Sequence, residues 1–289
     1  MIIKPMDLLL DTQSLYNQGL VSGHKTGWDE VDQFYTVRAG ELTLVTGMPS
    51  HGKSEWLDAL MVNLACKHGY VVTIFSPENH PLEMHHSKIL EKYLGKHFHK
   101  GPHVRMTREE MHTAVEWANK HFRFVKPADN EYTPLHIINE AATVFGHITS
   151  KPKAMIIDPW NEMDHLRPAQ FSETEYISHT LTELRRYARE FNVALFLVAH
   201  PMKLAKDKDG NYPVPRPYDI SGSAHWYNKA DNCIAVWRDV VNAPTETEIH
   251  VQKVRFRVTG KPGMAALRYN PATTRYEDDM VRIYEGRRG

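Results

Sequence analysis

The residues with the clearest chemical meaning lie between positions 47 and 54, which read GMPSHGKS. The two glycines allow the backbone to turn so that its N–H groups face bound phosphates. In this pattern, G-x-x-x-x-G-K-S, the lysine ammonium neutralises β- and γ-phosphate oxygens and the serine hydroxyl ligates Mg²⁺. We therefore predict that the chain binds ATP with Mg²⁺. The predicted contacts are Gly47, Pro49, Ser50, His51, Gly52, Lys53 and Ser54.

Acidic residues follow two apolar segments of the chain. Asp158 comes directly after the run AMII, and Glu78 follows YVVTIF by three residues. Mg²⁺ at a phosphate cradle needs a further carboxylate, usually at the end of a neighbouring strand, and we assign Asp158 to that role. Hydrolysis also needs a group that orients water. Glu78 is the predicted base, with Glu162 and Asp164 as alternatives.

A third apolar run, ALFLVA, ends at His200, and a loop rich in charge follows it. We predict that His200 contacts the γ-phosphate and reports hydrolysis to this loop, although a strand-end histidine is often only a satisfied polar residue. The loop carries Lys203, Lys206, Lys208 and Arg216. Such a composition suits a mobile segment that reaches a polyanion. Because three aspartates dilute the charge, a merely solvated loop is the alternative.

Further basic residues lie near the end of the chain, in the stretch VQKVRFRVTGKPG. In a regular strand, Lys253 and Arg255 share a face with Val251 and Arg257. Such a strand is expected at an exposed edge or at a subunit interface. An arginine that reaches into a neighbour's ATP site would stabilise the γ-phosphate charge in trans.

The elements that position these residues alternate between strand and helix. We expect strands at 41–46, 70–75, 122–125, 154–157, 194–199, 233–237 and 248–257, with a hairpin and an end strand in 264–284. Helices are expected at 54–67, 82–96, 108–120, 134–147 and 173–191. This alternation predicts an α/β fold with a mostly parallel sheet and helices on both faces. We divide the chain into an arm or linker helix at 1–25, which would pack on a neighbouring copy, and one domain at 26–289.

Composition narrows the class of protein. Of the 289 residues, 42% are apolar and 24% are charged, which is ordinary for a globular protein, and the formal net charge is zero. This balance disfavours broad, nonspecific coating of nucleic acid. Cys66 and Cys233 are predicted to be buried thiols in a reducing cytoplasm. The chain shows no secretory signal and no apolar run of ~18 residues, so we expect no membrane partner.

Taken together, the order of these motifs resembles the RecA-type motor domain of the hexameric replicative DNA helicases. This group contains DnaB, Twinkle and the phage primase-helicases, and the chain is most similar to the Twinkle-like or phage-type helicase half. The resemblance runs from about residue 26 to about residue 276. It is carried by TGWDEVD (26–32), GELTLVTGMPSHGKS (40–54), FSPEN (75–79), IIDPWNE (156–162), VAHPMK (198–203), YDISGSAHWYNKADNCIAVWRD (218–239) and QKVRFRVTGKPG (252–263).

The resemblance implies a role for each matching residue. Glu78 matches the catalytic glutamate, Asp158 the second Mg²⁺ acid, and His200 the γ-phosphate sensor. Arg255 matches the arginine finger that acts on the neighbouring subunit's nucleotide, with Lys253 beside it. Tyr269 resembles an aromatic residue that stacks on the base. The residues that match the DNA-binding loop and the motif after it are Lys203, Lys206, Lys208, Arg216, Ser221, Gly222 and Ser223.

The implied activity is that of an ATP-dependent helicase, a ring of six subunits on single-stranded and forked duplex DNA. Primase, polymerase or single-strand-binding protein are the implied partners, and we expect a cytoplasmic protein of a bacterium or a phage-infected cell. No primase region is seen in the sequence. The alternatives are a RecA/RadA-like recombinase and an ATP-gated regulatory oligomer that binds no nucleic acid. A small-molecule kinase is disfavoured, since no lid is evident.

Overall fold

One mixed sheet organises the chain. The structure is a computed structural model, and it describes residues 2–20, 22–127, 132–208, 210, 212–222 and 224–278. Within this part, nine strands lie in the order β3-β2-β4-β5-β1-β6-β7-β8-β9. The strands are β1 (Leu42–Thr46), β2 (Val71–Phe75), β3 (Phe122–Phe124), β4 (Lys153–Ile157), β5 (Val193–Val198), β6 (Asn232–Trp237), β7 (Glu246–Val254), β8 (Gly263–Asn270) and β9 (Arg275–Asp278).

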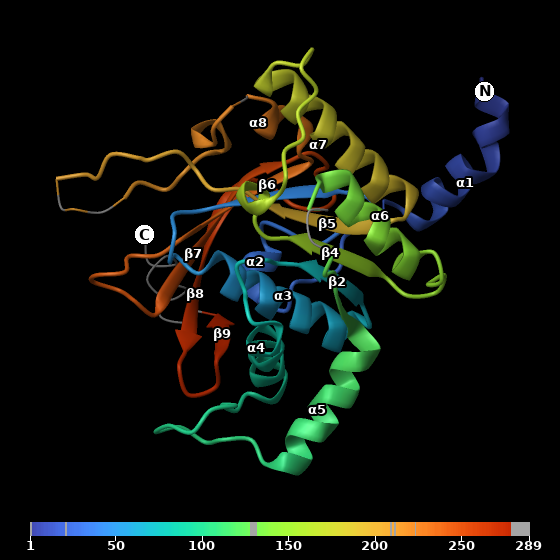
Figure 1. The fold of residues 1–289 in the computed structure, drawn as a ribbon. Helices are drawn as coiled ribbons and strands as arrows, with labels where there is room; N and C mark the ends of the chain where they lie inside the picture. Colours follow the sequence, from blue (N-terminus) through green and yellow to red (C-terminus); the bar gives the residue numbers. More distant parts are fainter. Residues whose placement is uncertain are drawn as a thin grey trace, which may run out of the picture.

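The first six strands of this order, from β3 to β6, pair in parallel, and β7, β8 and β9 continue the sheet as antiparallel strands. The helices are α1 (Leu9–Gln18), α2 (Asp29–Asp32), α3 (Lys53–His68), α4 (Leu82–Leu94), α5 (Arg108–His121), α6 (Pro134–Phe145), α7 (Glu173–Glu190) and α8 (His225–Lys229). They cover both faces of the sheet (Figure 1). The predicted fold class is therefore confirmed, and the predicted elements that fall within the described residues lie within a few residues of the observed ones. The part of the predicted end strand after residue 278 lies outside the described residues.

Each face of the sheet has its own apolar core. Below the sheet in Figure 1, α3 presents Trp56, Leu60 and Leu64, which are fully buried against the strands with residues of α4 and α5. On the opposite face, α6 and α7 bury a second cluster that includes Leu184. The helix ends follow local chemistry. Gly69, in a left-handed conformation, ends α3, and a capping box at Ser172 begins α7.

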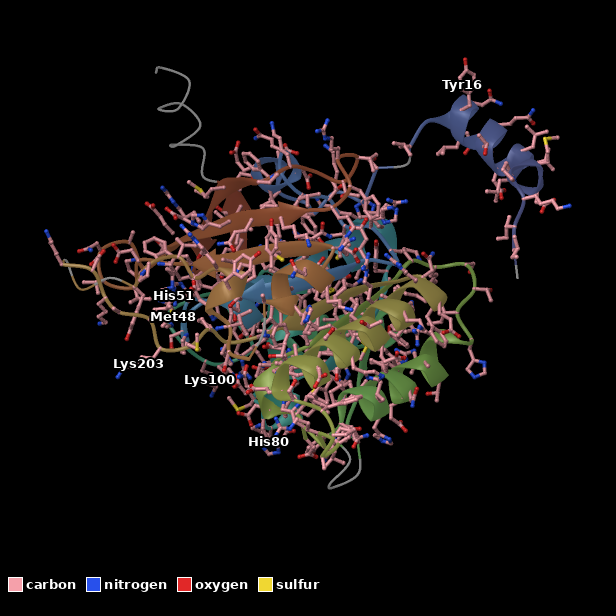
Figure 2. The ribbon with its side chains drawn as sticks, turned by 90° about the horizontal axis from the view of Figure 1, so that it is seen from above. Tyr16, Met48, His51, His80, Lys100 and Lys203 are labelled. Atoms are coloured by element: carbon pink, nitrogen blue, oxygen red, sulfur yellow. The ribbon has the colours of Figure 1, made fainter. Side chains whose placement is uncertain are left out.

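The arm predicted at the beginning of the chain contains a helix, α1, with no buried residue. Leu10 and Tyr16 expose 78% and 88% of their surface, so the apolar side of α1 makes no contact with the body of the chain. Figures 1 and 2 both show α1 standing apart from the sheet. Within the described ranges, no helix has the length and apolarity needed to cross a bilayer.

One prediction about the core is wrong. Cys66 is exposed, whereas Cys233 is buried as expected. Both cysteines have apolar sequence neighbours. In α3, however, Leu64 and Ala65 point into the core and Cys66 begins the outward side of the last turn. In a helix, each position rotates by 100°, so an apolar neighbour in the sequence does not imply a shared face.

Candidate nucleotide site

The phosphate cradle forms where β1 meets α3, at the carboxyl end of the parallel strands. A ligand site at this edge is typical of open α/β sheets. Gly47 passes so close to β6 that an added Cβ would lie 2.4 Å from the carbonyl oxygen of Val236. Gly52 takes φ 91°, which other residues rarely adopt, and α3 begins directly after it. The loop therefore aims its N–H groups and the positive end of α3 at one point.

Lys53 is held inside the cradle. Its side chain is buried, and its ammonium donates a hydrogen bond to the carbonyl of Met48 at 3.0 Å. Burial lowers the pKa of Lys53, while the nearby carboxylates of Asp158 and Glu78 act in the opposite direction. The two acids favour the charged form of the ammonium despite its burial. A charged ammonium with little water around it is suited to bind phosphate oxygens.

Asp158 and Ser54 lie together at the end of β4 and the start of α3. Asp158 is 3% exposed, and the Ser54 hydroxyl donates to its carboxylate. Burial raises the pKa of Asp158 to about 6, although the hydrogen bond from Ser54 and the charge of Lys53 partly oppose this shift. A buried carboxylate beside a hydroxyl offers the hard oxygen ligands that Mg²⁺ prefers. The pair fits Mg²⁺, and among the described residues no cluster of three His, Cys, Asp or Glu side chains offers an alternative metal site.

Glu78 and His200 face each other across this edge of the sheet. The His200 Nε2 lies 3.6 Å from the Glu78 carboxylate, and the His200 N–H donates to the Asn161 side chain at 3.0 Å. Burial, and then the charge of Lys53, lower the pKa of His200, so its ring is neutral at pH 7. Both side chains line one hollow of about 610 Å³ with the cradle. The cradle residues in that hollow are Pro49, Ser50, Gly52, Lys53 and Ser54.

The two alternative bases have other surroundings, although the charge of Glu162 tends to raise the pKa of His200. Glu162 is exposed in the short turn after β4, and it does not line the hollow. The Asp164 carboxylate accepts a hydrogen bond from the N–H of Tyr132 at 3.1 Å, so it stabilises a loop. The geometry therefore favours Glu78 as the base.

Arg238 is a site residue that the sequence analysis missed. Its N–H donates to Nδ1 of His51 at 3.2 Å, and its guanidinium donates to the carbonyl of Ser50 at 2.5 Å. Burial lowers the pKa of His51 to about 4, so the ring stays neutral and accepts this bond. Arg238 thus fixes the middle of the cradle from β6. Its position directly after the predicted strand 233–237 was the available signal.

Arg255 lies at the opposite end of the sheet from its own cradle. Its Nε is 2.8 Å from the buried carboxylate of Asp231, which also contacts Arg185 at 2.9 Å. Asp231 precedes β6, whereas Trp237, at the other end of that strand, lies beside the cradle. A six-residue strand spans about 20 Å, so Arg255 does not reach the nucleotide site of the same chain.

Lys253 lies beside Arg255, since both donate to the carbonyl of Ala230, but it does not share the face of Val251 as predicted. The pairing of β7 with β6 is irregular at Gln252, because Val251 and Lys253 oppose consecutive residues of β6. Val251 consequently packs into one core, and Lys253 reaches the other face, where its ammonium lies 4.7 Å from the centre of the Tyr227 ring. A β-bulge has this effect on side-chain alternation. The prediction that residues 251–257 present one regular face is wrong, and β7 is an internal strand rather than an edge.

Tyr269 lies in β8, close to the cradle but outside the hollow. Its half-buried ring packs on Tyr276 with 5.3 Å between ring centres. The Tyr276 hydroxyl in turn lies 3.2 Å from the point where a Cβ on Gly52 would be. Tyr276 therefore packs against the cradle at Gly52, and Tyr269 packs behind Tyr276. Base stacking by Tyr269 stays a prediction.

The basic loop, residues 203–216, projects from the same end of the molecule as the cradle (Figures 1 and 2). Figure 2 shows the labelled Lys203 at this end, together with Met48 and His51. The four predicted DNA-binding cations of the loop, Lys203, Lys206, Lys208 and Arg216, are all exposed. Their exposure leaves them available to a polyanion.

The base of this loop is closed by hydrogen bonds. The N–H of Met202 donates to the carbonyl of Asp219 at 2.7 Å. Directly after it, the carbonyl of Ser221 accepts from the Trp226 indole at 2.9 Å, and the carbonyl of Gly222 accepts from Thr174 at 2.8 Å. These carbonyls are therefore already bonded within the chain. Ser223, the third predicted residue of this motif, lies outside the described residues.

The fold and this site define a P-loop ATPase domain, and comparison with known proteins gives its family. Residues 23–278 match the family described as "DnaB-like helicase C terminal domain". The chain belongs to this family. It is 38% identical over 266 residues to the "Twinkle homolog protein, chloroplastic/mitochondrial" of Arabidopsis thaliana, covering 90% of this chain and 37% of that relative. The chain thus spans little more than a third of the relative's length, and the predicted resemblance is confirmed.

Solved structures support the same fold. The "ATPase Domain of G40P" has a TM-score of 0.76 and 17% identity, covering 96% of this chain and 99% of that one. A DnaB-like replicative helicase, described with its interactions with primase, has a TM-score of 0.74 and 17% identity, with 96% and 68% covered. The RadB recombinase is less similar, with a TM-score of 0.56 and 14% identity over 88% and 98% of the two chains.

The prediction of a cytoplasmic location in a bacterium or a phage-infected cell is contradicted. The relative that matches over 90% of the chain is named as a chloroplastic/mitochondrial protein, which points to an organelle instead. The prediction depended on the resemblance to bacterial and phage helicases and on the lack of a secretory signal, and neither distinguishes these compartments.

Proposed function

We propose that this chain is an ATP-driven motor that moves along single-stranded DNA and unwinds duplex DNA during replication. The observation that carries the proposal is the separation of Arg255 from its own cradle, combined with a complete set of cradle, acids and sensor at the other end of the sheet. Two chains are needed to bring all these groups to one nucleotide. The family supports the same activity.

Hydrolysis would use the residues in the hollow. Glu78 orients and activates the attacking water, while Lys53 and the cradle N–H groups stabilise the charge on the phosphates. Ser54 and Asp158 would hold Mg²⁺, which would supply positive charge to the phosphates. His200 lines this hollow and precedes the basic loop by three residues, so we assign it the sensing role.

The neighbouring subunit would complete the site with Arg255. A head-to-tail contact that repeats by rotation closes into a ring, and we propose six subunits. Residues 26–289 would form the motor domain, and the exposed helix α1 of the arm at 1–25 would dock on the next subunit through its apolar side. The basic loops would then line the channel and bind DNA phosphates. Lys253, beside Arg255, would act on the neighbouring subunit's nucleotide, and Tyr269 would stack on the base. Ser221, Gly222 and Ser223 would approach the DNA strand.

The partners of such a motor would be single-stranded and forked DNA, and a primase, polymerase or single-strand-binding protein. A primase is named in the description of one structurally similar helicase, which supports that choice for a relative of this fold. These partners are proposals for the whole protein, since the chain matches little more than a third of its curated relative.

The test compares ATP hydrolysis with and without single-stranded DNA, and unwinding of a forked substrate, in the wild type and a Lys203→Glu/Lys206→Glu/Lys208→Glu variant. We expect the variant to lose stimulation and unwinding while it retains basal hydrolysis. A matched control, Lys25→Glu/Lys120→Glu/Lys151→Glu, makes the same charge change on exposed side chains outside the basic loop. Wild-type protein without any stimulation would overturn the proposal in favour of an ATP-gated regulatory oligomer. Open filaments on DNA in place of closed rings would favour a recombinase.

A further inference from the structure

Trp237 is the last residue of β6, and it lies between the phosphate cradle and the basic loop. Its half-buried ring packs on the ring of His51, with 6.2 Å between centres and an angle of 65°. On its other side, the indole Nε1–H donates to the carbonyl of Tyr212 at 2.8 Å. One side chain therefore contacts two segments that the sequence separates by about 160 residues.

On the cradle side, the contacts leave little freedom between β6 and the phosphate loop. The carbonyl oxygen of Val236 is so close to Gly47 that no side chain fits there. Arg238, the next residue after Trp237, holds His51 and Ser50 by the two hydrogen bonds described above. A displacement of the cradle would therefore move the end of β6 with it.

On the loop side, the bond from Trp237 holds the returning half of the basic loop. The carbonyl that accepts it belongs to Tyr212, and the Tyr212 ring lies 4.9 Å from the ammonium of Lys206. Lys206 is one of the exposed cations proposed to bind DNA phosphate. An indole N–H that is partly buried usually has an acceptor, and the acceptor of Trp237 lies in a projecting loop and not in the core.

We propose that Trp237 is a positioning residue that couples the nucleotide state of the cradle to the DNA affinity of the basic loop within one subunit. The inference rests on the proposed function, since it assumes that the loop binds DNA. The path runs from His51 through Trp237 to Tyr212, and it is distinct from the one through His200, which begins at the γ-phosphate side of the site. Because coupling between two ligands is reciprocal, DNA bound to the loop would also bias the cradle.

A matched control is available in the same loop. The side chain of Gln252 donates to the carbonyl of Pro215 at 2.8 Å, so it also ties the returning half of the loop to the sheet. Gln252 lies in β7 and has no described contact with the cradle. Trp237→Phe keeps an aromatic ring but removes the N–H donor, and Gln252→Met removes the other tether. If tethering alone matters, the two variants should behave alike.

The experiment measures the affinity of the full chain for a fluorescein-labelled oligo(dT), once with ADP and once with a non-hydrolysable ATP analogue, both with Mg²⁺. The ratio of the two dissociation constants reports the coupling. We expect Trp237→Phe to reduce this ratio by about fivefold, the effect of one ordinary hydrogen bond, while nucleotide affinity and basal hydrolysis change less than twofold. Gln252→Met should weaken both DNA affinities equally and leave the ratio unchanged.

The possible outcomes separate the inference from the function on which it depends. A wild type that binds no oligo(dT) in either state would overturn the proposed function, and the inference with it. A wild type with a clear ratio that Trp237→Phe leaves intact would overturn the inference alone. An equal fall of the ratio in Trp237→Phe and Gln252→Met would also overturn it, because simple anchoring would then explain both.

Discussion

The carboxylate of Glu78 and the imidazole of His200 approach to 3.6 Å at the carboxyl end of the sheet. The two residues follow strands that are not adjacent, since β4 lies between β2 and β5. The lowered pKa of His200 keeps its ring uncharged at pH 7, so its contact with Glu78 is a polar contact between a neutral ring and a carboxylate, and not an ion pair. The Glu78 carboxylate is therefore available to a water molecule, while His200 positions the Glu78 side chain.

Replacing Glu78 by Gln tests the base directly. We expect kcat for ATP hydrolysis to fall by about 10²–10⁴-fold, the usual contribution of a general base, with ATP affinity nearly unchanged. Steady-state kinetics and nucleotide titration would measure the two quantities. The comparison is Glu162→Gln, the exposed alternative acid, whose charge acts on the His200 ring but which does not line the hollow; it should retain most of the wild-type kcat. A large loss of kcat in this variant and not in Glu78→Gln would reverse the assignment.

His200 should determine how activity changes with pH. The pKa of its ring is lowered below the ordinary 6.5, so the ring is neutral above that value and becomes charged only as the pH falls. A charged ring would pair with Glu78 and withdraw the base. DNA-stimulated hydrolysis should therefore decline in acid, and His200→Gln, which keeps a polar group without this titration, should decline less. Identical pH profiles for the two proteins would argue against the role of His200.

Much of the site was predictable because its parts depend on local sequence. The glycines of the cradle, the acid directly after AMII and the histidine after ALFLVA each follow an apolar run, and parallel strands bring such positions to one edge. Asp158, Glu78 and His200 therefore lie near the cradle as expected. The sequence alone is sufficient wherever a strand end determines the position.

The remaining contacts depend on tertiary packing that no local pattern records. The bulge at Gln252 reverses the faces of β7, and nothing in VQKVRF marks it. Asp231 pairs with Arg255 and Arg185 across long sequence separations, and Arg238 reaches back almost 190 residues to the cradle. Tertiary packing determines these partners, so no local sequence pattern predicts them.

Arg255→Ala should affect both stability and hydrolysis. Asp231 would lose one of its three cationic partners but retain Arg185 and Arg189, so we expect the free energy of unfolding to fall by about 1–3 kcal/mol. If Arg255 acts on a neighbour's nucleotide, kcat should fall by about 10³-fold or more. Thermal unfolding and steady-state ATPase assays would separate the two effects.

Mixing two inactive proteins tests whether the site lies between subunits. A mixed assembly of Glu78→Gln and Arg255→Ala contains some interfaces with an intact Glu78 and an intact Arg255, so part of the ATPase activity should return. The control mixes Glu78→Gln with a Lys53→Ala protein at the same total concentration; both changes lie on the cradle side of the interface, so no intact site forms and no activity should return. Failure of every mixing ratio to restore activity, in assemblies shown to contain both chains, would contradict a shared site.

Replacing Asp158 by Asn should change the pH dependence of the free energy of unfolding and, independently, abolish Mg²⁺-dependent hydrolysis. In the folded chain the pKa of Asp158 is raised to about 6, against 3.8 for an ordinary aspartate, so ionising it costs more when folded than when unfolded. The free energy of unfolding of the wild type should therefore fall as the pH rises from about 4 to about 6, by about 3 kcal/mol from this group. The Asn variant lacks this loss, so thermal unfolding without Mg²⁺ should show it to be more stable than the wild type at pH 8 but not at pH 4.

The same variant should lose Mg²⁺-dependent hydrolysis, because a ligand oxygen with its charge is gone. Asp11→Asn, on the exposed helix α1, is the control and should leave the pH dependence of unfolding unchanged. An Asn variant that is less stable than the wild type at pH 8 would show that the carboxylate is well compensated in the fold, contrary to this account.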